Sequence, residues 1–240
     1  MTESRTAIVT GGGRGIGEAI AYALARDGFR LVLAARTSSE LERVAAEVRR
    51  RGGMAETVTA DVSLAEDVDR IARAAVNARG GIDVLVNAAG VYGPIGPTWD
   101  VDPVEWVRAV HINLVGTFLC CRAVLPYMIA RRRGKIVNLS GGGATAPLPR
   151  FSAYGASKAA VVRLTETLAE EVREFNIQVN AIAPGAVDTR LQDQVLAAGE
   201  RAGPLWERIR TLRETGQGGV PPDLAADLVA FLASERADAL

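Results

Sequence analysis

The chain has 240 residues, which is enough to bury one sizeable core, so we expect a single domain over residues 1–240. Basic and acidic residues number 28 each, and this balance gives no long-range field that would favour nucleic acid or an anionic membrane surface. Apolar residues make up 48% of the chain, which excludes a disordered protein. We find no uninterrupted apolar run of the roughly 18 to 20 residues that span a bilayer and no signal sequence, so we expect a cytoplasmic protein without membrane contact.

Short β-branched runs alternate along the chain with longer segments of helical period. The strand-like runs are apolar throughout rather than alternating, as expected where helices cover both faces of a parallel sheet. The pattern predicts an α/β fold with a doubly wound parallel sheet in a three-layer αβα arrangement. The predicted strands are 6–10, 30–34, 55–60, 84–87, 135–140 and 178–182, and the predicted helices are 15–27, 39–51, 64–79, 103–131 and 152–174.

Two further features of the chain affect its chemistry. Cys120 and Cys121 are adjacent in a helical apolar stretch, where neighbouring side chains diverge, so we expect buried free thiols. His111 is the sole histidine and we expect it to be a partly buried structural residue, so no metal site is predicted. Residues 188–219 are mixed and glycine-containing, and we expect a partly helical, mobile lid there.

A glycine-rich turn, TGGGRGIG at residues 10–17, separates the first predicted strand from the first predicted helix. Glycines at such a turn let the backbone approach a pyrophosphate, and the free N–H groups and helix dipole attract its charge. The alternative is a turn that only packs a helix closely on a strand. The dinucleotide reading assigns cofactor contacts to Gly11, Arg14, Gly15, Ile16 and Gly17.

The next strand bears on which dinucleotide is bound. Folds that prefer NAD place an acidic residue roughly 20 positions beyond the glycines, where this chain has Ala35 and Arg36. The guanidinium groups of Arg36 and Arg14 suit a 2′-phosphate, and Thr37 adds a hydroxyl donor. Arg36 could also be a solvated arginine at a strand end. The residues favour NADP(H) over NAD(H).

Tyr154 and Lys158 lie one turn apart on the same face of a predicted helix. A tyrosine hydroxyl has a pKa of about 10, too high to exchange protons easily at neutral pH, and a nearby ammonium group lowers it. We therefore expect a lowered pKa for Tyr154. In isolation such a pair is commonplace on a surface, so its meaning depends on the rest of the chain.

Six motifs in order resemble the short-chain dehydrogenase/reductase family, in its short single-domain branch, from residue 5 to about residue 233. They are the turn at 10–17, Asp61-Val62, NAAG at 87–90, Asn113, Tyr154 with Lys158, and Pro184-Gly185 followed by Val187 and Thr189. The resemblance implies a Rossmann fold and hydride transfer between a nicotinamide and a small carbonyl or alcohol, with Tyr154 as general acid or base. It also implies a homodimer or homotetramer.

The resemblance implies a role for each motif. Asp61 would accept a hydrogen bond from the adenine amino group while Val62 packs beside the ring, although Asp61 could also cap a helix. The small residues Asn87, Ala88, Ala89 and Gly90 would leave room for the ribose and nicotinamide, although they could also be a plain turn. Asn113 would hold a water that relays protons, or is a buried backbone-bonded asparagine. Lys158 would bind the ribose hydroxyls, and Pro184, Gly185, Val187 and Thr189 would position the carboxamide.

The chain departs from the family pattern in two places. The strand before the catalytic helix ends NLSG where the family usually has Asn-x-Ser-Ser, so an ungapped count puts Gly141 in the place of the catalytic serine. Either a bulge lets Ser140, our catalytic candidate, reach the substrate, or the hydrogen bond comes from elsewhere, such as Thr145. The family also usually continues past residues 231–234 into a further strand, which we expect is missing here.

The function has two open alternatives. One is a catalytically weak NADP(H)-binding sensor or scaffold, because loss of a serine suits a retired enzyme. The other is a different chemistry on a similar framework, such as sugar-nucleotide epimerisation, which the short glycine spacing disfavours. Five apolar residues hint at an uncharged or aromatic substrate, although core packing would explain them nearly as well: Trp99, Leu148, Phe151, Leu191 and Trp206.

Overall fold

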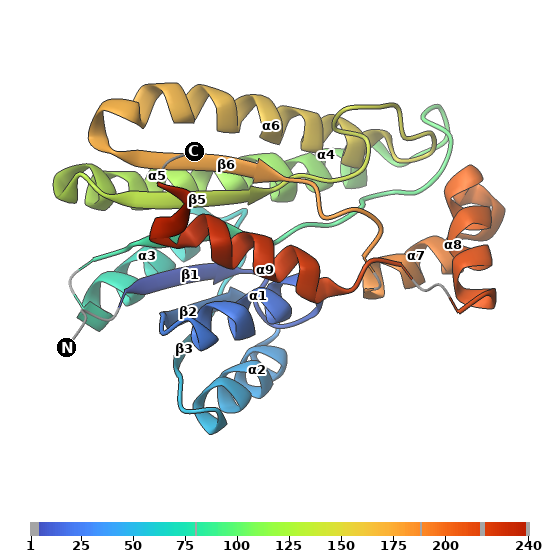
Figure 1. The fold of residues 1–240 in the computed structure, drawn as a ribbon. Coiled ribbons are helices and arrows are strands. Elements are labelled where there is room, and N and C mark those ends of the chain that lie inside the picture. Colours follow the sequence, from blue (N-terminus) through green and yellow to red (C-terminus); the bar gives the residue numbers. More distant parts are fainter. Residues whose placement is uncertain (1–4, 80, 188, 217–218, 239–240) are drawn as a thin grey trace.

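The computed structural model describes residues 5–79, 81–187, 189–216 and 219–238. Its parallel strands form one sheet in the order β3-β2-β1-β4-β5-β6, which confirms the predicted doubly wound fold (Figure 1). The order reverses between β1 and β4, and such a reversal opens a ligand crevice at the carboxyl ends of the strands. The strands are β1 (Thr6–Thr10), β2 (Arg30–Ala35), β3 (Met54–Thr59), β4 (Val84–Asn87), β5 (Gly134–Leu139) and β6 (Ile177–Ile182).

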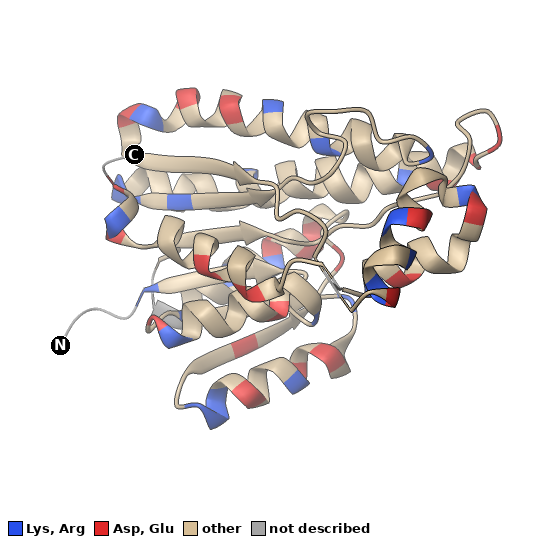
Figure 2. Ribbon diagram, turned by 45° about the vertical axis from the view of Figure 1, so that its right-hand side comes forward, with Lys and Arg blue, Asp and Glu red and all other residues tan. Residues whose placement is uncertain are grey.

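Helices cover both faces of the sheet and enclose two separate cores (Figure 1). One face carries α1 (Gly15–Arg26), α2 (Ser38–Arg50) and α9 (Pro222–Ala233), whose buried residues pack on β1 and β2. The other carries α3 (Ala65–Arg79), α5 (Gly116–Arg131) and α6 (Ser152–Val172). Acidic and basic side chains are interspersed over these outer helices, in keeping with the balanced charge (Figure 2).

β3 departs from the expectation of strands that are apolar throughout. Its residues alternate between exposed and partly buried positions, and its polar side chains include Glu56 and Thr57. The reason is its place at the sheet edge, where it has only β2 as a neighbour. An edge strand is less completely covered than a central one, so polar residues are tolerated there.

The predicted helix over 103–131 is divided into three parts. α4 (Pro103–Val110) leads into a π-helical turn over His111–Val115, and α5 follows. By length and composition this is the only described helical segment that could cross a membrane, with a mean hydropathy of 1.6, and 44% of that window is buried. Cys120 and Cys121 face the core as free thiols, as predicted, whereas His111 is exposed.

The predicted lid region contains two helices beyond the carboxyl ends of the strands. α7 (Arg190–Ala198) and α8 (Pro204–Glu214) are joined by a 3₁₀ turn and project from the body of the molecule (Figure 1). Val195, Ala202 and Ile209 of this region form a third core with Phe151. Residues 188, 217 and 218 of the predicted lid lie outside the described residues.

Candidate active site

The glycine turn after β1 has no space for side chains at Gly11 and Gly17. A Cβ at Gly11 would lie 2.9 Å from the Ala89 Cα, and the residue has a φ of +66° that favours glycine. A Cβ at Gly17 would overlap the Gly11 carbonyl oxygen. The turn therefore packs α1 closely on β1 and leaves backbone open to a ligand, which fits the pyrophosphate of a dinucleotide.

A cleft of about 410 Å³ lies at the carboxyl ends of the strands and is lined by this turn. Most of the predicted cofactor contacts line the cleft, whereas Asn87, Tyr154, Lys158, Pro184, Gly185 and Val187 do not. The lining residues that the sequence singled out are Gly11, Arg14, Gly15, Ile16, Gly17, Arg36, Thr37, Asp61, Val62, Ala88, Ala89, Gly90 and Thr189.

Asn87 differs from the residues that follow it because its side chain points into the protein. Its amide donates to the Asn138 Oδ1 at 2.9 Å, which ties β4 to β5, and the side chain is buried. Ala88 and Ala89 each donate a backbone hydrogen bond to the Thr10 hydroxyl at 3.2 Å. Thr10 thus fixes the turn after β4 against the turn after β1. Asn87 does not line the cleft and instead links β4 to β5 inside the protein.

Charged side chains surround the end of the cleft near β2. Arg14 and Arg36 are exposed and line it, and no carboxylate stands at Ala35. Glu40 also lines the cleft, accepts a hydrogen bond from Arg190 at 2.8 Å and lies 3.6 Å from the Arg14 guanidinium. The two guanidinium groups predicted to bind a 2′-phosphate therefore line the cleft, but the Glu40 carboxylate is already close to one of them, that of Arg14.

Asp61 forms a local turn with Ser63 ahead of α3, which begins at Ala65, rather than capping that helix. One carboxylate oxygen accepts from the backbone and the hydroxyl of Ser63, at 3.0 and 2.7 Å. Burial raises the pKa of Asp61, but the Ser63 hydrogen bonds and the charge of Arg36 outweigh it, so the pKa lies below its usual value. An ionised Asp61 at the cleft wall can accept a further hydrogen bond.

Lys158 lies near Tyr154, and Lys158 and Asn113 both approach Gly90 in the cleft wall, although none of the three lines the cleft itself. The Lys158 Nζ lies 5.7 Å from the Tyr154 ring centroid and donates to the Leu139 carbonyl at 2.6 Å. A Cβ placed at Gly90, which lines the cleft, would lie 3.3 Å from the Asn113 Oδ1 and 3.5 Å from the Lys158 Nζ. The lysine and the asparagine therefore pack against Gly90 in the cleft wall, where a side chain would crowd both of them.

The pKa of Tyr154 differs from the sequence expectation. Burial raises it well above the usual value, and the neighbouring Tyr92 raises it further. Burial lowers the pKa of Lys158 to about 8, because a charged ammonium is costly in a low-dielectric interior. The groups of the chain alone therefore keep Tyr154 protonated, and the expected lowering by Lys158 does not occur in this structure.

Asn113 lies in the π-helical turn and is completely buried. Its side chain accepts from the Val91 N–H and donates to the Val91 carbonyl, both at 2.8 Å, and donates to the Ser157 Oγ at 2.9 Å. This is the backbone-bonded arrangement that the sequence left as an alternative. A π-helical turn often accompanies functional sites because it frees local backbone groups.

Ser140 and Gly141 occupy different environments. The Ser140 hydroxyl is buried and donates to the Lys158 carbonyl at 3.3 Å, which ties β5 to α6. A Cβ placed at Gly141 would instead overlap the Tyr154 hydroxyl oxygen. The bulge that would turn Ser140 towards Tyr154 is therefore not what the structure shows: Gly141 faces the tyrosine, and the Ser140 hydroxyl bonds to the helix backbone.

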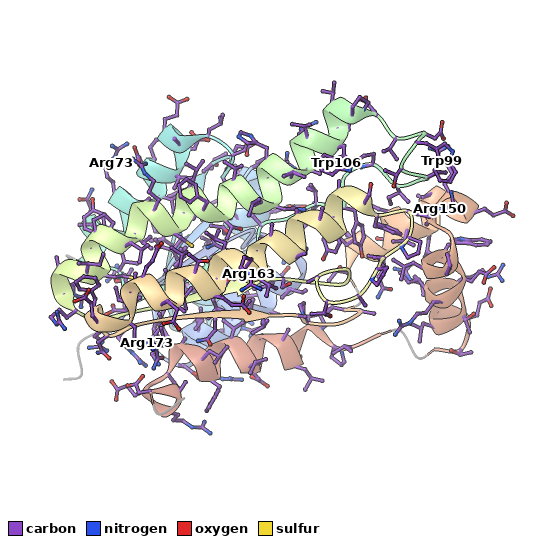
Figure 3. All side chains as sticks on the ribbon, turned by 90° about the horizontal axis from the view of Figure 1, so that it is seen from above. Arg73, Trp99, Trp106, Arg150, Arg163 and Arg173 are labelled. Atoms are coloured by element: carbon purple, nitrogen blue, oxygen red, sulfur yellow. The ribbon has the colours of Figure 1, made fainter. Side chains whose placement is uncertain are left out.

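The predicted apolar pocket is only partly assembled. Leu148, Phe151 and Trp206 share the third core with Tyr154, and Leu191 lines the cleft. Trp99 does not contribute, because it is 88% exposed at the rim of the molecule (Figure 3). Sequence reasoning missed Tyr92, which contacts the Tyr154 ring; its position just beyond the carboxyl end of β4, where ligands lie in such sheets, was the available signal.

The segment after β6 approaches the cleft through Thr189. A Cβ placed at Gly15 would lie 3.3 Å from the Thr189 Cγ2, so the threonine packs on the glycine turn. The Val187 carbonyl accepts from the Gln192 side chain at 3.0 Å, and Val187 pairs with Val220. Pro184 and Gly185 connect β6 to this segment, with Gly185 at a φ of +79°.

Comparisons with known proteins agree with this arrangement. A family model described as short chain dehydrogenase matches residues 5–199. The chain is 38% identical over 237 residues to 3beta-hydroxysteroid dehydrogenase 1 of Eggerthella lenta, covering 98% of this chain and 88% of the relative.

Solved structures of similar proteins hold either nicotinamide cofactor. A variant of actinorhodin polyketide ketoreductase with NADPH superimposes with a TM-score of 0.91 at 32% identity, covering all of this chain and 94% of the other. NAD⁺-bound xylitol dehydrogenase gives the same TM-score at 30% identity, covering all of this chain and 96% of the other. The chain therefore belongs to the short-chain dehydrogenase family and is an NAD(P)-dependent oxidoreductase.

Proposed function

We propose that this protein uses NADPH to reduce an uncharged, apolar or aromatic carbonyl compound, with Tyr154 as the proton donor. The observation that carries the proposal is the meeting of the Lys158 Nζ and the Asn113 side chain at Gly90, beside Tyr154 and at the end of the cleft. The relatives reported above act on alcohols and carbonyls by name, which supports the reaction class.

The residues that would hold NADPH divide along the cleft. The glycine turn would receive the pyrophosphate, Arg14, Arg36 and Thr37 the 2′-phosphate, and Asp61 with Val62 the adenine. Ala88, Ala89 and Gly90 would leave space for the nicotinamide ribose, and Pro184, Gly185, Val187 and Thr189 would orient the carboxamide. When bound, NADPH supplies the hydride and a binding partner for the Lys158 ammonium.

Side chains of this protein would then supply the proton and compensate the charge that its transfer leaves behind. Tyr154 is held protonated by burial, so at neutral pH it is ready to donate to a carbonyl oxygen, which suits reduction. Lys158 would bind ribose hydroxyls and compensate the charge left on Tyr154, and Asn113 would support a proton path to Lys158. The apolar side chains around Phe151 and Trp206 would bind the rest of the substrate and exclude water.

We further propose a cytoplasmic homodimer or homotetramer with one domain, in which α7 and α8 close over the substrate. Ser140 would support Lys158 through the helix backbone rather than touch the substrate, since its hydroxyl bonds to the Lys158 carbonyl. In this assignment, neither Ser140 nor Gly141 supplies the hydrogen bond to the substrate that the family's serine usually provides.

The test is NADPH oxidation with aromatic ketones and 1,2-diketones, such as acetophenone and benzil, compared with NADH. The expected result is turnover that favours NADPH and disappears in Tyr154→Phe while NADPH still binds. Full activity in Tyr154→Phe would refute the proposed mechanism. Tight NADPH binding without turnover of any carbonyl would instead favour the sensor or scaffold alternative, for which Gly141 is the supporting observation.

A further inference from the structure

The ring of Tyr92 packs against two other aromatic rings, those of Tyr154 and Phe151. The Tyr92 and Tyr154 ring centroids lie 4.8 Å apart at an interplanar angle of 71°, and Tyr92 meets Phe151 in the same edge-to-face manner at 5.1 Å. All three rings belong to the third core, with Leu148 and Trp206 of the predicted substrate pocket. Tyr92 therefore contacts both Tyr154 and Phe151, one of the residues expected to hold the substrate.

The backbone that carries Tyr92 is fixed relative to the helix that carries Tyr154. Asn113 forms a two-point amide pairing with Val91, the residue before Tyr92, and its amide also donates to the Ser157 Oγ. Ser157 in turn donates to the Tyr154 carbonyl at 2.8 Å. One buried asparagine thus joins the two tyrosine-bearing segments, which gives the rings a defined relationship.

The Tyr92 hydroxyl has no hydrogen-bond partner among the residues that the structure describes. Burial raises the pKa of Tyr92, so the group remains protonated and able to donate at neutral pH. The hydroxyl oxygen keeps some exposure to solvent, so a ligand oxygen can take the place of water as its partner. The ring is held by packing while the hydroxyl remains available.

Of the other positions near Tyr154, residue 141 has no hydroxyl, and the hydroxyls of Ser140 and Ser157 are engaged. Gly141, which faces the Tyr154 hydroxyl, has no side chain to donate. Ser140 bonds to the Lys158 carbonyl, and Ser157 bonds to the Tyr154 carbonyl. Thr145, the alternative raised from the sequence, is exposed and forms no hydrogen bond within the described part of the chain.

We propose that the Tyr92 hydroxyl donates a second hydrogen bond to the substrate carbonyl oxygen. It would take the role of the serine that the family usually has where this chain has Gly141. The inference rests on the proposed role of Tyr154. In the step, hydride from NADPH forms the new C–H bond at the carbonyl carbon, and the Tyr154 proton passes to the oxygen. Tyr92 keeps its own proton and stabilises the charge that develops on that oxygen, as an oxyanion-hole donor does.

The test uses Tyr92→Phe, which removes the hydroxyl and keeps the ring packing. Single-turnover oxidation of NADPH by benzil is expected to slow by about 10- to 100-fold, with NADPH affinity and melting temperature unchanged. Tyr127→Phe, which loses the hydroxyl of an exposed tyrosine on α5, is the matched control and is expected to keep the wild-type rate. A Tyr92→Phe rate within about twofold of wild type would overturn the proposal.

A second measurement separates hydrogen bonding from packing. Across para-substituted acetophenones, loss of a donor to the oxygen should make the rate depend more steeply on electron withdrawal, because the substrate must then stabilise more of the charge itself. An equal slowing of all the ketones would assign Tyr92 to packing alone and overturn the proposal. If Tyr154→Phe stays active, the proposed function itself fails; if only that variant is inactive and Tyr92→Phe is normal, the inference alone fails.

Discussion

Gly141 and Tyr154 are in such close apposition that the glycine has no room for a side chain. A Cβ at Gly141 would overlap the tyrosine hydroxyl oxygen and lie 3.0 Å from its Cζ. The tyrosine thus extends into space that a serine at this position would occupy. The position of the proposed proton donor, Tyr154, therefore depends on the absence of a side chain at residue 141.

The first prediction concerns Gly141→Ala. The added methyl group should push the Tyr154 hydroxyl aside and lower kcat by about 10-fold or more, because small displacements of a reacting group are costly. NADPH affinity, measured by fluorescence titration, should not change. Gly142→Ala is the matched control, since its Cβ would meet only the Leu148 side chain at 3.7 Å. Equal activity in the two variants would contradict this dependence.

The second prediction concerns the ionisation of Lys158, one of only two lysines in the chain, the other being Lys135. NMR of ¹³Cε-labelled lysine should show one resonance with a pKa of about 8, assigned by its persistence in Lys135→Arg. The ammonium form should predominate below that pH and be lost above it. A Lys158 resonance that titrates near the usual 10.5 would contradict burial as the cause.

The same shift of the Lys158 pKa has a consequence for stability. Between pH 8 and pH 10.5 the unfolded chain holds a proton that the folded chain has released, so the free energy of unfolding should rise with pH. The rise should amount to about 3 kcal/mol at most, and Lys158→Met should lack this part of the pH dependence. Urea unfolding at several pH values compares the two proteins.

The third prediction concerns Arg36→Ala and the choice of cofactor. Loss of the guanidinium proposed to bind the 2′-phosphate should weaken NADPH binding by about 10- to 100-fold, because charge-assisted hydrogen bonds to phosphate are strong. NADH binding should change little, since it has no such phosphate. Arg26→Ala, an exposed arginine outside the cleft, is the control. An equal loss for both cofactors would argue against recognition of the phosphate.

The fourth prediction concerns Glu40→Gln. Its carboxylate competes for Arg14 and attracts Arg190, so its neutralisation should strengthen NADPH binding by about two- to fivefold, as expected for partly exposed pairs. Glu42→Gln is the control, since Glu42 lies on the same helix and pairs with Arg49 away from the cleft. Weaker NADPH binding in Glu40→Gln would show that the carboxylate positions Arg14 rather than competing for it.

The fifth prediction concerns Asn113→Ala. The change leaves the Val91 N–H and carbonyl without their partner in a buried place, and should lower the free energy of unfolding by about 2 to 4 kcal/mol. Asn77→Ala, at an exposed position on α3, should stay close to wild type. Urea unfolding measures both. If the two variants were equally stable, the amide pairing could not be the element that fixes this loop.

The pattern of the sequence determined the sheet, its parallel order and the position of the cleft, because buried parallel strands and glycine turns depend on local residue types. Helical spacing put Tyr154 and Lys158 on one face, and the resemblance of the other motifs to the family made this pair the catalytic candidate. The identity of residue 141 was readable as a departure from the family. What that departure meant was not readable, because one step along a strand reverses the direction of a side chain.

Only the tertiary structure decided which groups meet at Tyr154. Gly141 turned out to face the hydroxyl, Ser140 to bond to the backbone of α6, and Tyr92 to contact the ring from a loop distant in sequence. It also decided the sign of the Tyr154 pKa shift, because burial depends on the packing of several elements at once. Local spacing can place two residues on one helix, but contacts between loops arise only when the whole chain has folded.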